Sequence, residues 1–168
     1  ASSINTLSGS AADLNTAYTA SGNGSILGLG NEAVTLSDTS LTASVLNTLD
    51  GNTSGAINAS NITTLTGSAS YIESIYDSPG ITGLGNEDIT LFYSIPTAAL
   101  LKRLDSDTSG TINTQFLTSI KGKASDLIDI YASSGISNLG NEVVNVNSGT
   151  ASTSQANTLA ADTSAVVT

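Results

Sequence analysis

The sequence is organised around a five-residue motif that returns at a fixed interval. Gly-Leu-Gly-Asn-Glu occupies residues 28–32 and 83–87, and Asn-Leu-Gly-Asn-Glu occupies residues 138–142. Tyr76 and Tyr131 keep the same step. A fixed period of about 55 residues indicates one supersecondary unit copied in tandem. This repeat constrains the fold more than any other feature, and it favours a structural or interaction array over a single-pocket enzyme.

The copies also predict how the chain is divided. Counted from the segment before each Leu-Asp pair, residues 37–91 and 92–146 are two full copies. Residues 1–36 match the back half of a copy, and residues 147–168 match a front half. We therefore expect one continuous stack of about three repeats. Extra residues near Asn23 lengthen the first copy, which indicates a surface loop.

Hydrophobic spacing predicts the elements of each copy. Alternating apolar residues over 88–92 predict a short strand, and the apolar spacing over 41–49 predicts a helix. A second short strand is expected at 56–57, then a short helix over 62–67 closed by glycine, then a further helix from Ser68. The predicted fold is mostly α with short β strands. It is a tandem, solenoid-like repeat of strand–helix–loop–strand–helix–helix units.

Charge and composition narrow the classes of partner and of chemistry. Fourteen acidic residues stand against four basic ones, giving a net charge of −10, which disfavours nucleic acid and anionic lipid. The chain has no Cys and no His, which excludes a disulfide framework, zinc or haem ligation, and Ser-His-Asp or Cys-His catalysis. No apolar run approaches the roughly 20 residues of a membrane span. Aromatic residues are scarce and no acid pair stands outside the acidic loops, so we expect no hydrolase of glycosidase type and no enzyme.

An acidic loop follows the first predicted helix of each full copy. Its residues fit positions 1, 3, 5, 7 and 9 of a calcium loop of EF-hand type, where oxygens converge on a hard cation. In the second full copy these positions are Asp105, Asp107, Ser109, Thr111 and Asn113. In the first full copy they are Asp50, Asn52, Ser54, Ala56 and Asn58. The first full copy has one carboxylate among these positions and the second has two, so we expect calcium to prefer the second.

Position 12 of the loop does not fit calcium. An EF-hand has a bidentate acid there, whereas this chain has Asn61 in one copy and Phe116 in the other. The alternative is an Asx-capped turn between two helices, with Gly55 and Gly110 in the left-handed conformation. Both interpretations stay open, so the expected cofactor is either Ca²⁺ or none.

The recurrent motif itself offers a second candidate site. Its last residue is an acid in every copy: Glu32, Glu87 and Glu142. Either these acids form a ladder that binds cations or a neighbour, or they are solvated at a turn that leads into the strand, and we favour the turn. A tyrosine also recurs at the apolar edge of a predicted helix: Tyr18, Tyr76 and Tyr131. We expect these rings to pack in the core and not to stack on a ligand.

The repeated segments resemble those of a known kind of protein. LNTLDGNTSG, LTGSAS and GLGNE resemble the tandem arrays of very large bacterial surface and secreted proteins, especially those of marine cyanobacteria. The acidic loops separately resemble dockerin and EF-hand loops over nine positions. The resemblance implies an extracellular repeat module at the cell surface.

These observations together give an expected function. We expect an extracellular structural or interaction repeat module of a bacterial surface layer, adhesin or self-assembling filament. The alternative is a calcium- or carbohydrate-binding module attached to a larger secreted protein. The expected partner is another copy, joined head to tail or as a neighbouring repeat, because residues 1–36 and 147–168 are complementary halves. We expect no nucleic acid partner and no membrane insertion.

Overall fold

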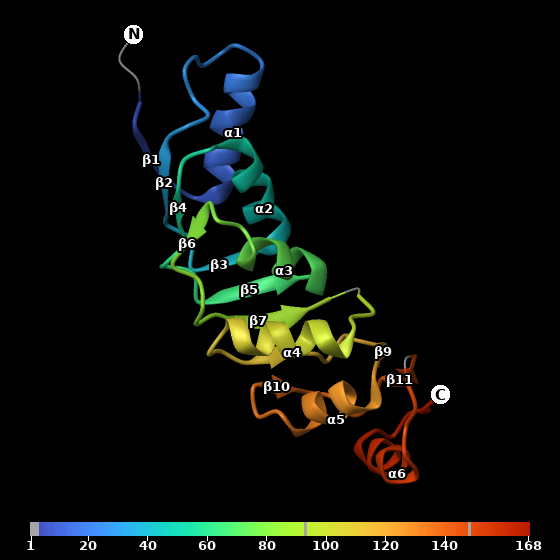
Figure 1. The fold of residues 1–168 in the computed structure, drawn as a ribbon. Coiled ribbons are helices and arrows are strands. Elements are labelled where there is room, and N and C mark those ends of the chain that lie inside the picture. Colours follow the sequence, from blue (N-terminus) through green and yellow to red (C-terminus); the bar gives the residue numbers. More distant parts are fainter. Residues whose placement is uncertain (1–3, 93, 148) are drawn as a thin grey trace.

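The computed structural model describes residues 4–92, 94–147 and 149–168, which form eleven strands and six helices. The strands are β1 (Thr6–Gly9), β2 (Ala33–Leu36), β3 (Ser40–Thr42), β4 (Ile57–Asn58), β5 (Thr64–Gly67), β6 (Ile81–Thr82), β7 (Asp88–Leu91), β8 (Ile112–Asn113), β9 (Ser119–Gly122), β10 (Ile136–Ser137) and β11 (Val143–Val146). The helices are α1 (Ala11–Gly22), α2 (Ala43–Asn52), α3 (Ala69–Tyr76), α4 (Ala98–Asp107), α5 (Ala124–Ala132) and α6 (Thr153–Asp162). Figure 1 shows the helices following one another along an elongated molecule, from α1 near the N-terminal end to α6 near the C-terminal end.

The strands pair in parallel, and this overturns the predicted fold class. One sheet has the order β1-β2-β4-β6, a second has the order β10-β8-β7-β5-β3, and β11 pairs with β9. The described residues therefore form an α/β fold with parallel sheets, and the prediction of a mostly α, solenoid-like repeat is wrong. The physical reason is strand length. Five of these strands, β3, β4, β6, β8 and β10, have only two or three residues and are too short to show a periodicity of their own in the sequence.

The segment predicted as a short helix illustrates the error. Residues 64–67 form β5, which lies between β3 and β7. Leu65 is fully buried opposite Leu41 on one side and Ile89 on the other, so its burial comes from neighbouring strands and not from a helix face. The strand predicted at 88–92 is confirmed as β7.

Helices form where a capping residue precedes an apolar series with helical spacing. Ser68 caps α3, since its hydroxyl accepts a hydrogen bond from the Tyr71 N–H, which confirms the helix predicted from Ser68. Four of the helices then bury an alanine and two larger aliphatic residues at intervals of three. In α2 these are Ala43, Leu46 and Leu49. The alanine allows close approach of a strand, because a Cβ on Gly67 would lie 3.2 Å from the Ala43 Cβ.

Each helix packs against the next along the chain, from α1 on α2 to α5 on α6. The buried aliphatic side chains of helices and strands form one continuous core between them. More chain separates β1 from its partner β2 than separates the partners of any other strand pair. The extra residues near Asn23 account for this difference. They lie in an exposed turn after α1, as predicted for a surface loop.

Candidate functional site

A buried carboxylate recurs three times in the molecule. Glu32, Glu87 and Glu142 are 0%, 0% and 1% exposed, so the prediction that they are solvated is wrong. Each stands just before a strand, β2, β7 or β11. The turn before the strand folds the carboxylate back onto the chain, where it accepts a hydrogen bond from the N–H of the glycine two residues earlier.

The geometry of this turn explains why glycine stands two residues before the acid in the repeated motif. The N–H groups of Gly30 and Gly85 donate to the carboxylates of Glu32 and Glu87, each with a shortest N–O distance of 2.9 Å. These glycines have φ angles of 130° and 129°, in a region that residues with a side chain rarely adopt. Glycine therefore places its N–H where the buried acid needs a donor.

A tyrosine hydroxyl provides the second donor to each buried acid. Tyr18 in α1 donates to Glu32 at 3.1 Å, and Tyr76 in α3 donates to Glu87 at 2.7 Å. The hydroxyl of Tyr131 in α5 donates to Glu142 in the same way. The rings pack against the core, as predicted, but their hydrogen bonds to the acids were not predicted. The tyrosine links the end of a helix to the turn before a strand.

Burial and hydrogen bonding shift the pKa values of Glu32, Tyr76 and Tyr131. Burial opposes the charge on Glu32, but the backbone N–H groups and the Tyr18 hydroxyl outweigh it and lower the pKa of Glu32 below its ordinary value. Burial, with the nearby Glu87 carboxylate, raises the pKa of Tyr76 far above its usual range, and the pKa of Tyr131 shows the same shift beside Glu142. An ionised acid held among fixed donors away from solvent stabilises the turn.

A threonine hydroxyl provides a further hydrogen bond to two of these turns. Thr53 and Thr108 donate from their hydroxyls to the backbone carbonyls of Glu32 and Glu87, at 3.1 and 2.8 Å. A Cβ on Gly110, two residues after Thr108, would lie 2.2 Å from the Glu87 carbonyl oxygen. Gly55 has the same relation to Glu32.

The prediction that Gly55 and Gly110 are left-handed is wrong, because neither has a positive φ. Glycine allows the close backbone approach at these two positions. Ala165 occupies the equivalent position of the third copy.

The residues predicted to bind calcium are spread over the end of a helix, the loop that follows it and a short strand. Asp50 and Asn52 lie in α2, and Asp105 and Asp107 lie in the last turn of α4. The final residues of β4 and β8 are Asn58 and Asn113. The acidic segments therefore begin inside a helix, where an EF-hand loop would already be turning around its ion.

Several of these groups hydrogen-bond to neighbouring parts of the chain. Asp50 accepts from the Ser78 hydroxyl at 2.8 Å, and Asp105 accepts from the Ser133 hydroxyl at 2.7 Å. The Ser54 and Ser109 hydroxyls donate to the carbonyls of Gly30 and Gly85, while the carbonyls of Ala56 and Thr111 accept from Val34 and Ile89. The described residues contain no group of three or more acidic, His or Cys side chains placed to hold a metal ion. This arrangement does not fit an EF-hand ligand set, and calcium binding stays a prediction.

Two of the four basic residues connect neighbouring helices. Lys102 in α4 forms ion pairs with Asp126 and Asp129 in α5. Arg103 pairs with Glu73 and Asp77 on the α3 side of the same helix. Across the described part of the chain, no helix combines the length and apolar character needed to cross a membrane.

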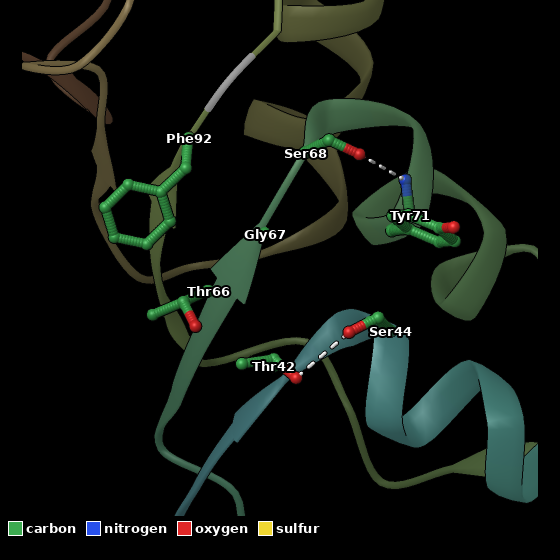
Figure 2. Close-up of a pocket in the computed structure, with 7 residues that line it drawn as sticks. All are labelled: Thr42, Ser44, Thr66, Gly67, Ser68, Tyr71 and Phe92. Carbon is green, nitrogen blue, oxygen red and sulfur yellow. Dashed lines mark hydrogen bonds between the residues drawn. The ribbon is translucent and has the colours of Figure 1, made fainter.

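A pocket of about 480 Å³ opens beside the end of β5. Figure 2 shows Phe92 and Tyr71 on either side of Gly67, with hydroxyl-bearing side chains between and below them. The lining residues are Thr42, Ser44, Thr66, Gly67, Ser68, Tyr71 and Phe92. Phe92 also contacts Phe116, with ring centroids 4.8 Å apart. Tyr71 and Phe116 are 49% and 50% exposed, so aromatic surface is accessible here.

The sequence contained a signal for this pocket that was missed. At the two aromatic positions of the lining and at Phe116, which contacts Phe92, the residues one period away are polar. Tyr71 corresponds to Asp126, Phe92 to Asn147, and Phe116 to Asn61. A comparison of the copies for departures from the period would have marked these aromatics, because the polar residues in the other copy indicate that the fold does not require them.

The fold and these sites define the chain by its architecture, as an α/β protein with parallel sheets, internal Glu–Tyr pairs and an aromatic pocket. Comparisons with protein-family models, with curated proteins and with solved structures found no match.

Proposed function

We propose that this protein is a structural and interaction module of a bacterial cell surface, which works outside the cell by associating with further copies of itself. The observations that support this proposal are the open edge of β1 and the exposed apolar side chains of Leu27 and Val166 among the described residues. Among the described residues β1 pairs only with β2, so its other edge is open. An open edge is a template for a further strand.

We define the N-terminal face by Ile4, Ile26 and Leu27. Their apolar side chains are exposed to water. Leu27 is 84% exposed, the largest value among the exposed apolar side chains of the described residues. Ile26 corresponds by the period to Ile136, which is buried in β10 and pairs with Ile112 of β8. A strand in the position of β8 would therefore cover Ile26.

The C-terminal face consists of α6 and residues 166–168, and it offers such a strand. Val167 corresponds to Ile112, and it already forms a parallel bridge with Val144 on one side. Val166 is 62% exposed, and α6 buries only Leu159. By analogy with the β8–β10 pair, Val167 of one copy lies opposite Ile26 of the next. The two faces differ, so the contact is heterologous and builds an open filament unless its rotation closes a ring.

Composition agrees with an extracellular setting. The chain has no Cys, is rich in Ser and Thr, and has a net charge of −10. Copies with this charge repel one another at low ionic strength, and salt screens the repulsion. Association should therefore increase with salt as well as with protein concentration.

A cross-link between copies tests the proposal directly. The chain has no Cys, so Ile26→Cys and Val167→Cys introduce the only thiols. Adjacent parallel strands lie about 4.8 Å apart, within the range that a disulfide spans. Mixing the two variants under oxidation should give a covalent dimer, whereas Ile26→Cys mixed with Phe116→Cys should not.

Light scattering gives the second test. The measured mass should rise with concentration for the unmodified chain, and Leu27→Asp should stay monomeric because its charge lies on the N-terminal face. Phe116→Asn, which removes exposed apolar surface away from both faces, should assemble normally. A chain that remains monomeric at every concentration, with and without salt and calcium, would refute the proposal.

A further inference from the structure

We propose that the pocket between Tyr71 and Phe92 is a binding site for a neutral saccharide. The site lies beside the end of β5, in the middle of the chain, and is separate from the N-terminal and C-terminal faces. The proposal does not depend on self-association, and either can fail without the other.

The first argument is that three aromatic side chains lie close together, at positions where the equivalent residues of the other copies are polar. Tyr71 lies on α3, Phe92 follows β7, and Phe116 lies between β8 and β9, yet all three reach one region of the surface. Asp126 and Asn147 stand in two of these places one copy later. Exposed aromatic surface is unfavourable in water unless something covers it. The exposed faces of Tyr71 and Phe116 are therefore accessible to a ligand.

The second argument is the chemistry of the lining. A sugar ring has a face of C–H groups, which packs on an aromatic face, and an edge of hydroxyls. The hydroxyls of a sugar would find hydrogen-bonding partners among the side chains of the pocket. Thr42 and Ser44 form a hydroxyl pair at 3.2 Å, and Ser68 lies across from them. A hydroxyl is both donor and acceptor, so it matches the hydroxyl edge of a sugar.

Charge and size restrict the ligand further. None of the described residues that line the pocket is charged, so these residues offer no partner for an ionic group. The net charge of −10 disfavours an acidic saccharide approaching from solution. The volume of about 480 Å³ is within the usual range of small-ligand pockets. A neutral sugar unit satisfies these conditions.

The strand beside the pocket argues against an extended peptide. Peptides that bind along a sheet need an open strand edge for their backbone hydrogen bonds. β5 pairs with β3 on one side and with β7 on the other, so it offers no such edge.

The test uses an array of neutral glycans, with cellohexaose, maltohexaose and xylohexaose measured by titration calorimetry. At least one neutral glycan should bind the unmodified chain, and an acidic galacturonate oligomer should bind more weakly. Tyr71→Asp and Phe92→Asn should each lower the affinity by about tenfold or more, since each removes a stacking face. Both variants carry residues that the next copy already has, and their folding is checked by circular dichroism.

Leu27→Asp is the matched control, because it should block assembly and leave glycan binding unchanged. The proposal is overturned if no neutral glycan binds the unmodified chain. It is also overturned if the folded variants Tyr71→Asp and Phe92→Asn bind as well as the unmodified chain. Binding of an apolar peptide to the pocket, with no glycan bound, would likewise overturn it.

Discussion

The hydroxyl of Tyr76 donates a hydrogen bond of 2.7 Å to the buried carboxylate of Glu87. The two residues are 11 positions apart, whereas the equivalent Tyr18 and Glu32 are 14 apart. The extra residues near Asn23 form an exposed turn, and the hydrogen bond from Tyr18 to Glu32 is kept. The pair thus ties the end of a helix to the turn before the next strand, whatever the length between them.

Removal of this hydroxyl should destabilise the protein. Tyr76→Phe leaves the Glu87 carboxylate with one donor fewer in a buried place, at a cost of about 1–3 kcal/mol in the free energy of unfolding. Urea denaturation measures this cost. Tyr71→Phe is the control, since its ring is half exposed and it should change stability little. Equal effects of the two changes would show that the Tyr76–Glu87 bond contributes nothing.

Acid should weaken the fold through the buried Glu32. The pKa of Glu32 is lower in the folded protein than the ordinary value of 4.5, so the folded state binds its proton less tightly than the unfolded state does. The stabilisation is present above pH 4.5 and is lost as the pH falls toward the folded pKa. Urea unfolding at a series of pH values should show this decline. Glu32→Gln should start from a lower stability and lose less of it in acid.

Alkali should weaken the fold through the tyrosines. The pKa of Tyr76 and that of Tyr131 are raised in the folded protein above the ordinary value of 10.0. The stabilisation is therefore complete below pH 10.0 and falls as the pH rises toward the folded values. Phenolate absorbance from these rings should appear together with the loss of helical circular dichroism. Its appearance while the chain is still folded would contradict the buried pairing.

Two glycine substitutions should act in opposite directions. A Cβ on Gly110 would lie 2.2 Å from the Glu87 carbonyl oxygen, so Gly110→Ala forces the backbone to shift and should cost about 1–3 kcal/mol. Gly51 lies in α2 with no atom within 4 Å of an added Cβ, so Gly51→Ala should stabilise by about 0.5–1 kcal/mol. Thermal unfolding separates the two. A neutral Gly110→Ala would refute the close approach.

Calcium binding has a direct test in the second acidic segment. If Asp105 and Asp107 bind the ion, calcium should raise the melting temperature, and the Asp105→Ala, Asp107→Ala double variant should lose this rise. The Ser133 hydroxyl already donates to Asp105, so a calcium ion would share this carboxylate with it. A rise that survives in the double variant would place the ion elsewhere.

The local signals in the sequence were strong where a residue type has one structural use. Alternating apolar residues identified β7, and Ser68 before an apolar series identified the start of α3. The fold class could not be predicted in the same way. The strands β4 and β6 are only a residue pair each, and their strand character comes from pairing with segments far away in the sequence.

The candidate sites were predictable only in part. Glutamate is nearly always exposed, so burial of Glu87 could not be expected without knowing that Tyr76 and Gly85 supply donors to it. The aromatic pocket joins residues from three segments, which no local pattern connects. Its members were visible only as departures from the period, such as Tyr71 in place of Asp126.

The pairing distance between strands has a mechanical consequence. Val34 pairs with Ile57, which pairs with Ile81. The residue one period after Val34 is Ile89, so two strand pairings span fewer residues than one period. The sheets therefore overlap along the sequence, because β3 of the second sheet precedes β6, the last strand of the first sheet. β4 belongs to one sheet and β5, which soon follows it, to the next. Because the sheets overlap, we expect mechanical unfolding by a force along the molecule to require shearing of two sheets together, and not the separation of one sheet alone.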